Sequence, residues 1–350
     1  MSEKNKIAII IPSYNGLDYL TSLLPQLAQE SYEDFDLEII IVDNASSDKS
    51  VDFIKENYSH LTLLENTKNT GYVGANNIGY EYAKKNNFRF IYLLNQDTEI
   101  IRGFLQPLYS FAMTNQFGSL QSKLKLFPET HKINSLGNVI HYLGFGYSRA
   151  CEQIDNKQAK IKKINYASGA GVFINMEALD DLGYLFDETM FAYLEDLDLG
   201  WSLQLLGYDN YLIPDSVVFH KYEFDRSIKQ VYWFERNRLW VMLKNYKLLT
   251  LLIFLPAWLL MELGQIYFAW RNKYLKNKFK AYKFLFSIQQ LKILLSKRQD
   301  IQNKRVINDR QILMRFSGKI LFQPLESFLL KIANSILDAY FQVIRLFIIW

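Results

Sequence analysis

The sequence predicts an α/β fold in which a mostly parallel sheet is covered on both faces by helices. Two observations predict it. Short, continuous apolar runs alternate with amphipathic segments over the first hundred residues, and each apolar run ends in a polar loop. Continuous apolar strands are typical of sheets whose two faces are both buried. In such sheets ligands bind outside the carboxyl ends of the strands.

Four strands and the helices between them account for this first part of the chain. Apolar residues from Leu20 to Ala28 recur at the spacing of one helix face, and residues 73–85 indicate another helix. Ser47 is expected to cap the helix that carries Val51 and Ile54 inward. The predicted strands are residues 6–11, 37–42, 61–64 and 88–94.

The polar loops after these strands predict a binding edge. They are residues 12–16, 43–46, 69–71 and 95–98. Because the carboxyl ends of parallel strands meet at one edge, the four loops are expected to lie together. No single loop is diagnostic, but their agreement predicts a ligand site.

The segment from 115 to 240 is less uniform. Residues 115–165 mix turns with short strands, and Glu195–Leu206 is expected to be a helix that Gly207 ends. Residues 208–218 predict a strand pair or an extended run that leads to His220.

Composition restricts the class of protein. Of the 350 residues, 49% are hydrophobic and 22% charged, enough apolar sequence for a large domain with an appendage. Cys151 is the only cysteine, so no disulfide framework forms within the chain, which fits a reducing compartment. The first residues lack the basic and apolar regions of a signal peptide, and the catalytic part is therefore expected in the cytoplasm.

Two aspartates at strand ends have the chemistry of a nucleotide site. The Asp43 carboxylate can accept the imide N–H of uracil or thymine, although a loop or capping role explains it equally well. Asp97 follows the fourth strand directly, and its hard oxygen atoms suit Mg²⁺ or Mn²⁺. Each is weak evidence when taken alone.

Three acids lie within four positions at the start of the predicted helix. They are Glu195, Asp196 and Asp198. A helix N-terminus stabilises one negative charge, and ordinary enrichment of acids in a first turn is the competing explanation. The functional interpretation is that one of the acids is a general base. His220 ends an apolar run beside Lys221, where a metal or diphosphate contact competes with a structural role.

The C-terminal third changes character. Residues 248–270 are strongly apolar but contain Pro256, Glu262 and Gln265. Their length permits a membrane span, yet a helix or hairpin lying in the membrane interface is favoured, with a soluble packing element as the third possibility. Residues 271–310 hold twelve Lys or Arg against two Asp, a local net charge of +10. That block indicates an anionic surface or a solvated helix face. The apolar tail, residues 324–350, is expected to anchor to lipid or to mediate self-association.

Seven segments of the chain resemble those of a known family and occur in the same order along the sequence. They are IIPSYNG, IIIVDNASSD, NTKNTGYVGANNIGY, YLLNQDTEI, YASGAGVFINMEALDDLGYLFDETMFAYLEDLDLGWSLQLLGY and PDSVVFHK, then WFERNRLW. The chain resembles a family 2 glycosyltransferase of the GT-A fold, in its rhamnosyltransferase-like branch, over about residues 6–240. This resemblance implies a Rossmann-like mixed sheet flanked by helices, followed by a helical, membrane-associating C-terminal region.

The resemblance also implies a role for individual residues. Asp196 matches the catalytic base and Glu195 its neighbour, while Asp97 and His220 match metal-binding positions for Mg²⁺ or Mn²⁺. The family's acidic metal motif is incomplete, because Asn95 stands where its first acid is expected. Candidate acceptor contacts are Gly169, Ala170, Arg236 and Arg238, the two arginines being equally compatible with a structural role. Implied donor contacts are Pro12, Tyr14, Asn15, Asp43, Asn44, Asn69, Gly71, Asn77, Asn95, Gln96 and Asp97.

The implied activity is inverting transfer of a sugar from a nucleoside diphosphate to a hydroxyl group. The donor would be linked to dTDP, as in dTDP-rhamnose, or to UDP. The acceptor would be a glycan or a polyprenyl-diphosphate-linked glycan at the cytoplasmic face of the cell membrane, in cell-surface polysaccharide assembly. The Gln-x-x-Arg-Trp element of processive synthases does not occur after Gln230, which favours addition of one or a few sugars.

The implied domains are residues 1–240, a catalytic domain, and 241–350, a helical region. The catalytic domain divides into a nucleotide-sugar-binding half, 1–114, and an acceptor half, 115–240. A nucleotidyltransferase is disfavoured because the loop after the first strand has one glycine and no Lys or Arg. A non-catalytic scaffold relative is the remaining alternative. No nucleic-acid-binding motif accompanies the basic block.

Overall fold

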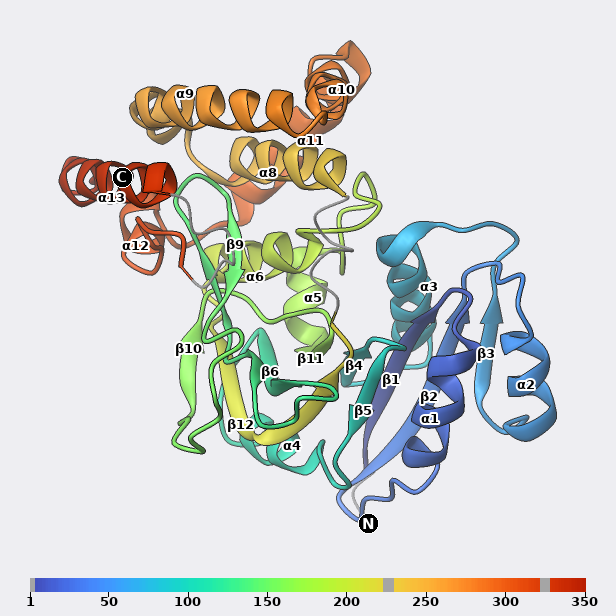
Figure 1. Ribbon diagram of the computed structural model, residues 1–350. Coiled ribbons are helices and arrows are strands. Elements are labelled where there is room, and N and C mark those ends of the chain that lie inside the picture. The colour runs from blue at the N-terminus through green and yellow to red at the C-terminus, as the bar shows by residue number, and fades with distance from the viewer. Residues whose placement is uncertain (1–3, 223–229, 322–327) are drawn as a thin grey trace.

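The computed structural model describes residues 4–222, 230–321 and 328–350. A ten-stranded sheet with helices on its faces makes up the larger part of the molecule (Figure 1). Helices α8 to α13 form a separate layer beside the end of the sheet that carries β10 and β12 (Figure 1). The predicted α/β class, with a mixed sheet flanked by helices, is confirmed.

The main path of the sheet runs β10–β12–β6–β11–β4–β1–β2–β3, with β5 beside β12 and β7 beside β6. Strands β1 to β4 are parallel, whereas β11 runs antiparallel to both β4 and β6. The sheet is therefore mixed. The strands are β1 Asn5–Ser13, β2 Phe35–Asp43, β3 Thr62–Glu65, β4 Phe90–Leu94, β5 Thr98–Ile100, β6 Ser119–Leu126, β7 Ile133–Ser135, β10 Lys162–Ile164, β11 Gly171–Asn175 and β12 Asn210–His220. A separate hairpin pairs β8 Asn138–Ile140 with β9 Gly146–Ser148.

Alternate residues of β1 show how both faces are buried. Ala8 and Ile10 belong to the core that includes α3, while Ile7, Ile9 and Ile11 belong to the core that includes α1. This period of two follows from the pleat of a strand. The helices of this part are α1 Leu17–Leu27, α2 Ser50–Asn57, α3 Gly71–Lys85 and α4 Gln106–Ala112.

The expected cap at Ser47 is wrong. Helix α2 begins at Ser50 and has no side-chain hydrogen bond at its cap. Asp48 makes the hydrogen bonds at the start of this helix instead, since its carboxylate accepts the N–H groups of Ser50 and Leu17. Ser47 instead donates its own N–H to Asn15 Oδ1. The loop after β2 is therefore tied to the loop after β1 rather than to the helix.

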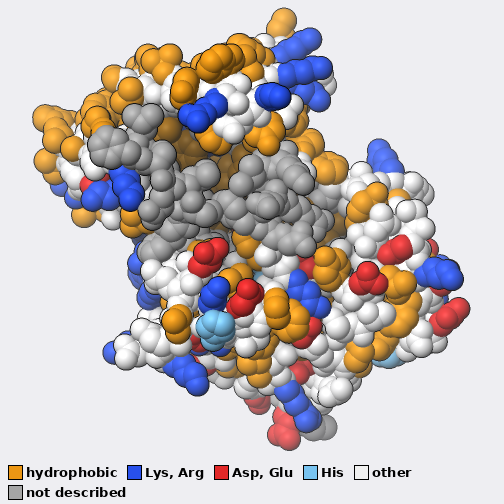
Figure 2. Space-filling view, in the orientation of Figure 1, with side chains coloured by type: hydrophobic (Ala, Val, Ile, Leu, Met, Phe, Trp, Pro, Cys, Tyr) orange, Lys and Arg blue, Asp and Glu red, His pale blue; other side chains and the backbone are white. Residues whose placement is uncertain are grey.

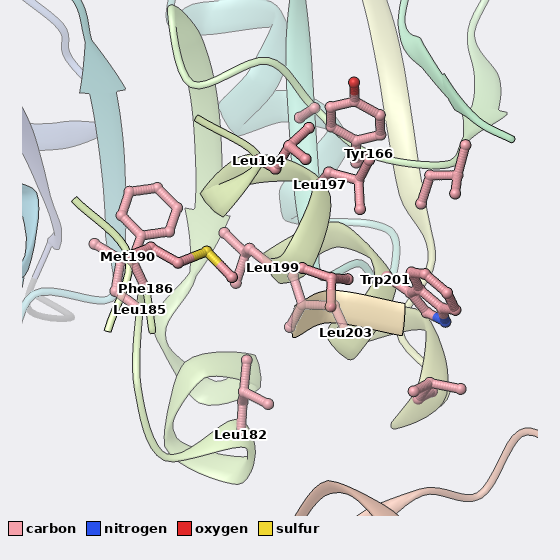
Figure 3. Packing of buried hydrophobic residues seen from close by; sticks show 14 of the residues in the cluster. Tyr166, Leu182, Leu185, Phe186, Met190, Leu194, Leu197, Leu199, Trp201 and Leu203 are labelled. Atoms are coloured by element: carbon pink, nitrogen blue, oxygen red, sulfur yellow. The ribbon is translucent and has the colours of Figure 1, made fainter. Parts of the chain in front are cut away.

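Helices α5 Met176–Leu182 and α6 Glu195–Leu205 stand between the sheet and the C-terminal layer. Figure 3 shows Leu199 of α6 beside Met190 of the preceding segment and Leu197 beside Tyr166. Trp201 of the same helix packs edge-on against the rings of Tyr246 and Phe316. Burying one large apolar side chain contributes roughly 1.5–3 kcal/mol. This packing fixes the position of α6 and therefore the position of the acids at its first turn.

The C-terminal layer is joined to the sheet part by buried polar contacts. Lys244 at the end of α8 forms an ion pair with Asp198 of α6, and both side chains are buried. The boundary expected between the catalytic domain and the helical region, at residues 240 and 241, falls inside α8, which runs through it without a break. That division into domains stays a prediction. The helices are α8 Val231–Asn245, α9 Leu248–Arg271, α10 Leu275–Leu285, α11 Ile288–Lys304, α12 Asp309–Leu313 and α13 Phe328–Ile344. Residues 324–327 of the predicted apolar tail lie outside the described residues.

Candidate active site

A cavity of about 400 Å³ lies at the carboxyl edge of strands β1, β2 and β4. The loops after these strands form one side, and the segments 168–170, 191–196 and 220–222 form the other. The edge is therefore where the alternation of strands and polar loops predicts it. The predicted site residues that line the cavity are Pro12, Tyr14, Asn44, Asn69, Gly71, Asn95, Gln96, Asp97, Gly169, Ala170, Glu195, Asp196 and His220.

Five predicted site residues do not line this cavity. Asn77 exchanges hydrogen bonds with the main chain of Phe186, so it joins α3 to the segment before α6. Asn15 binds Ser47 as described above, and it has a left-handed φ of 46°. Asp43, Arg236 and Arg238 are the other three, and their surroundings are described below.

Asn44 organises the donor-side loops. Its Nδ2 donates to Asn69 Oδ1 at 3.1 Å and to the Gly71 carbonyl at 3.0 Å. Its Oδ1 accepts from the Thr70 N–H at 2.9 Å and from Asn66. The amide is thus occupied within the loops, and it holds the start of α3 against the end of β2.

Gln96 fixes the neighbouring loop in the same way. Its Oε1 accepts the Tyr14 N–H at 3.0 Å, and its Nε2 donates to the Tyr14 carbonyl at 3.3 Å. A β-carbon at Gly16 would meet Gln96 Oε1 at 2.2 Å, so only glycine allows this approach. The Tyr14 side chain itself stays exposed beside the cavity.

Asp43 is buried directly behind this edge. Its Oδ2 accepts the Ser46 N–H at 3.0 Å, whereas Oδ1 has no hydrogen-bond partner among the described residues. A buried carboxylate oxygen without a donor is costly. An approaching N–H group, such as the imide of a uracil or thymine base, would satisfy it.

Asp97 and His220 meet in the lining of the cavity. Strand β12 pairs with β5 so that His220 lies opposite Thr98, which brings His220 Nε2 to 3.4 Å from Asp97 Oδ1. His220 Nδ1 lies 3.1 Å from Asn134 Oδ1. An N–H on Nδ1 that donates to Asn134 leaves the Nε2 lone pair toward Asp97.

These two side chains fit the protein's share of a divalent metal site. One carboxylate oxygen and one imidazole nitrogen are both ligands that Mn²⁺ accepts. No group of three or more His, Cys, Asp or Glu side chains that could hold a metal occurs in the described parts of the chain. The other ligands would have to come from substrate phosphates and water, as is usual for such ions.

Glu195 and Asp196 lie at the first turn of α6, facing the cavity. Asp196 Oδ2 accepts the Gly169 N–H at 3.3 Å and Oδ1 accepts the Leu197 N–H at 2.8 Å. Glu195 Oε2 is buried without a hydrogen-bond partner among the described residues. No Lys, Arg or His among the described residues forms an ion pair with either carboxylate within 4.0 Å.

Burial raises the pKa of both carboxyl groups. For Glu195, repulsion from Asp196 adds to the effect of burial. For Asp196, burial outweighs the N–H groups of Gly169 and Leu197, which act in the opposite direction. A carboxylate with a raised pKa is a better proton acceptor than an ordinary one, which is the requirement for a general base near neutral pH.

The loop in front of this pair is held from α8. Tyr193 and Leu194 both have left-handed φ angles, 70° and 65°, which cost energy in residues other than glycine. Asn237 is buried and donates its Nδ2 to the Ala192 carbonyl at 3.0 Å and to the Tyr193 carbonyl. Arg236 donates to the Thr189 carbonyl at 2.8 Å.

Neither arginine faces an acceptor in this structure. Arg236 is buried over the rings of Trp233 and Phe284. Arg238 is buried and bound to Glu262 and to the Leu143 carbonyl, which is the structural role that the sequence left open, and an acceptor contact stays a prediction. The physical reason is that α8 turns both guanidinium groups into protein, where Arg236 bonds to Asn237 and the Thr189 carbonyl and Arg238 bonds to Glu262 and the Leu143 carbonyl.

Some cavity residues are not identified by the sequence analysis. Tyr72 donates its hydroxyl to the Gly169 carbonyl at 2.9 Å, and Gly169 in turn holds Asp196. Lys221 lines the cavity and forms an ion pair with Glu99 at 3.0 Å. Phe191 stacks on Trp233 with ring centroids 5.0 Å apart. In the sequence, Tyr72 is distinguished only by its position next to Gly71. The spacing of residues gives no indication that Phe191 belongs to the site.

Comparison with known families and structures agrees with this geometry. The model of the family "Glycosyl transferase family 2" matches residues 8–183, which is half of the chain. The chain belongs to glycosyl transferase family 2. The matched segment contains Asp97, whereas Glu195, Asp196 and His220 lie after it.

Curated relatives share the sequence over a shorter stretch. A poly(ribitol-phosphate) beta-glucosyltransferase of Bacillus spizizenii is 34% identical over 124 residues, covering 34% of this chain and 19% of that protein. The chain therefore matches only about a fifth of the length of that relative. A TarS protein of Staphylococcus aureus, a poly(ribitol-phosphate) beta-N-acetylglucosaminyltransferase, is 24% identical over 120 residues, or 34% of this chain and 21% of TarS.

Solved structures confirm the GT-A-like fold. GalNAc-T7 with UDP, GalNAc and Mn²⁺ has a TM-score of 0.55 and 15% identity, covering 69% of this chain and 48% of that chain. The 1–349 fragment of Staphylococcus aureus TarS with UDP-GlcNAc has a TM-score of 0.51 and 16% identity, covering 97% and 90%. At these identities the likeness shows the fold.

Proposed function

We propose that the protein is an inverting, metal-dependent glycosyltransferase that moves a sugar from a nucleoside diphosphate to a hydroxyl of a cell-surface glycan. The observation that carries the proposal is the acid pair Glu195–Asp196, with which no described cation pairs, and which lines one cavity together with the Asp97–His220 pair. A proton acceptor and a candidate metal site are both needed for this reaction.

Asp196 is the general base in this proposal. The acceptor oxygen attacks the anomeric carbon, the bond from that carbon to the diphosphate oxygen breaks, and its electron pair leaves with the diphosphate. The acceptor proton passes to Asp196, whose Oδ1 and Oδ2 are oriented by the Leu197 and Gly169 N–H groups. Attack from the side opposite the leaving group inverts the configuration at the anomeric carbon.

Asp97 and His220 would hold Mg²⁺ or Mn²⁺ against the diphosphate. When bound, the ion would neutralise the charge that develops on the leaving group. The bound Mn²⁺ of GalNAc-T7, named above, supports a metal in this fold. Asp43 would read the base through its unpaired oxygen, with Tyr14 and Asn95 along the donor side of the cavity.

The donor and acceptor are proposed by class. The UDP-sugar bound to TarS supports a UDP-linked donor, whereas dTDP-rhamnose stays a prediction from sequence. The names of the curated relatives support an acceptor among cell-wall polymers or lipid-linked glycans. Such acceptors are assembled at a membrane, so the proposed place of action is its cytoplasmic face, with peripheral or monotopic attachment.

A donor screen tests this function. Purified protein would be incubated with UDP-, dTDP- and GDP-sugars, and nucleotide release would be measured with and without a glycan acceptor. We expect release with one class of donor, its loss in EDTA, its return with Mn²⁺, and a product of inverted configuration by NMR. Asp97→Ala should weaken nucleotide binding only when metal is present. A protein that binds sugar nucleotides but releases none would be the non-catalytic relative instead.

A further inference from the structure

An apolar surface covers the outer side of the C-terminal layer. Figure 2 shows hydrophobic side chains gathered over α9 and α13, with Lys and Arg side chains near the α10 end. We call the outward residues of these two helices the docking face. The exposed apolar residues of α9 are Leu248, Leu249, Leu252, Leu255, Leu259, Leu260, Leu263, Tyr267, Phe268 and Trp270. On and after α13 they are Ile332, Ile336, Val343, Leu346, Phe347 and Ile349.

We propose that the docking face lays the protein on an anionic lipid bilayer, with α9 in the plane of the membrane rather than across it. The enzyme would then work beside a membrane-bound acceptor, so the biological purpose rests on the proposed function. Docking itself depends only on residues of the C-terminal layer.

The two faces of α9 differ in solvent exposure along the whole helix. Its inward residues Thr250, Phe254, Ala257, Glu262 and Ala269 are buried, although α9 is long and apolar enough to cross a membrane by length and composition. Helix α13 joins it through main-chain and side-chain contacts, since the Tyr340 hydroxyl donates to the Ile253 carbonyl. Because protein covers the inward face, only the outward apolar residues of α9 are free to contact lipid.

The buried contacts of Glu262 favour α9 lying in the plane of the membrane over α9 crossing it. Its carboxylate is bound by Arg238 of α8, by Lys278 of α10 at 2.8 Å and by the Tyr282 hydroxyl. Lys278 also bonds to Glu235 of α8 at 2.6 Å. Two cations and two anions thus tie α9 to two neighbouring helices. If α9 crossed a bilayer in this packing, the whole charged cluster would enter the hydrocarbon, where charges are expensive.

The positive charge around the docking face favours an anionic membrane as its partner. Glu262 is the only acidic residue between positions 248 and 299, and it is buried. Every exposed charge on α9 and α10 is therefore positive, and the exposed cations are Arg271, Lys273, Lys276, Lys280 and Lys283. Two copies of this face would repel each other, whereas an anionic leaflet would attract it. Tyr267 and Trp270 near the end of α9 are the aromatic types that favour the headgroup region.

Vesicle flotation tests the proposal with the full chain. The vesicles would contain phosphatidylglycerol and phosphatidylcholine, or phosphatidylcholine alone. We expect at least tenfold more binding to the anionic vesicles. The variant L252E/L259E/L263E, which charges three exposed leucines of one helix face, should lose at least tenfold of that binding. The matched control I101E/I154E/I161E charges three exposed isoleucines outside the C-terminal layer and should bind as the unaltered chain does.

A second variant isolates the charge. K276Q/K280Q/K283Q should weaken binding to anionic vesicles several-fold and leave the weak binding to neutral vesicles unchanged. Equal binding of the leucine variant and the unaltered chain would overturn the proposal. A dimer in light scattering that the leucine variant separates would also overturn it, because a second copy would then cover the face.

Cysteine labelling distinguishes a lying helix from a crossing one. Single cysteines would replace Lys247 and Asn272, at the two ends of α9, in a Cys151→Ser background. When protein is added outside preformed vesicles, an impermeant maleimide should label both ends. Protection of one end would show crossing and refute the in-plane arrangement. Binding and labelling need no donor, so a failure of sugar transfer on a water-soluble acceptor would count against the proposed function alone.

Discussion

Two groups of buried acids, one in the cavity and one in the helical layer, differ in their surroundings. Glu195 and Asp196 line the cavity, where no cation of the described residues pairs with them, and burial raises the pKa of both carboxyl groups. Glu262 is also buried, but the charge of Arg238 and hydrogen bonds from Lys278 and Tyr282 outweigh burial and lower its pKa. The two groups differ in charge compensation: two cations neutralise the acids that tie the helices together, whereas no described cation pairs with the acids proposed to accept a proton.

The largest effect is expected from Asp196→Asn. The amide keeps the size of the side chain but cannot accept the acceptor proton, so kcat should fall about 10²–10⁴-fold. Stability should not fall, because a carboxyl with a raised pKa is replaced by a neutral group. Steady-state kinetics and thermal unfolding of the same preparations measure the two quantities. Near-normal turnover would remove Asp196 from the role of base.

The opposite pattern is expected from Glu262→Ala. It leaves Arg238 and Lys278 with one carboxylate between them, and breaking a buried ion pair in this way costs about 3–5 kcal/mol of unfolding free energy. In variants that still fold, kcat on a soluble acceptor should change little. Urea unfolding gives the stability. Glu65→Ala is the matched control, since its pair with Lys55 is exposed and such pairs contribute about 0–1 kcal/mol. Equal losses in the two variants would contradict the role assigned to the cluster.

An intermediate effect is expected where α8 holds the catalytic loop. Asn237→Leu keeps the approximate shape of the side chain but removes both hydrogen bonds to the loop before Glu195. Because small misplacements of catalytic groups are costly, kcat should fall about 10–10²-fold with little change in donor KM.

The control for that variant is Asn210→Leu. Asn210 is also buried and also donates to two carbonyls, those of Asn165 and Gly200, at 2.9 Å each. It should lose comparable stability while kcat stays near normal. Asn237→Ser, which keeps one donor, should recover part of the rate. If kcat falls equally in the Asn237 and Asn210 variants, the loop contact is only structural.

The smallest effect concerns pH. Since the folded-state pKa of Glu195 is raised, its contribution to stability is fully present below the unfolded pKa and is lost as pH rises through the folded value. Glu195→Gln should therefore raise the unfolding free energy near pH 8 by on the order of 1 kcal/mol and leave it unchanged near pH 4. Urea unfolding at both pH values measures this. No difference between the two would show that Glu195 is solvated.

The raised pKa of Asp196 also determines how the rate depends on pH. Asp196 must be ionised to accept a proton, and burial raises its pKa. The acid limb of the kcat profile should therefore lie above the value of about 3.9 for an ordinary aspartate. An acid limb at the ordinary value would contradict the burial of this side chain in the working enzyme.

The sequence by itself determined the sheet and its binding edge. Apolar runs such as residues 37–42 bury on both faces whatever their neighbours are, and the loops after parallel strands must share one edge. The acids at the start of α6 were visible as a local cluster. The pairing of Asp97 with His220 came from resemblance alone, because the antiparallel contact of β5 and β12 that joins them leaves no periodic signal.

Only the tertiary structure decided what each polar side chain faces. Arg238 and Asn77 have the residue types of ligand contacts, but packing turns them toward Glu262 and the Phe186 main chain. Glu262 interrupts an apolar run in the sequence, and folding supplies the two cations that neutralise it. The physical reason is that burial and charge compensation depend on partners far away along the chain, whereas strand and helix periodicity depends on near neighbours.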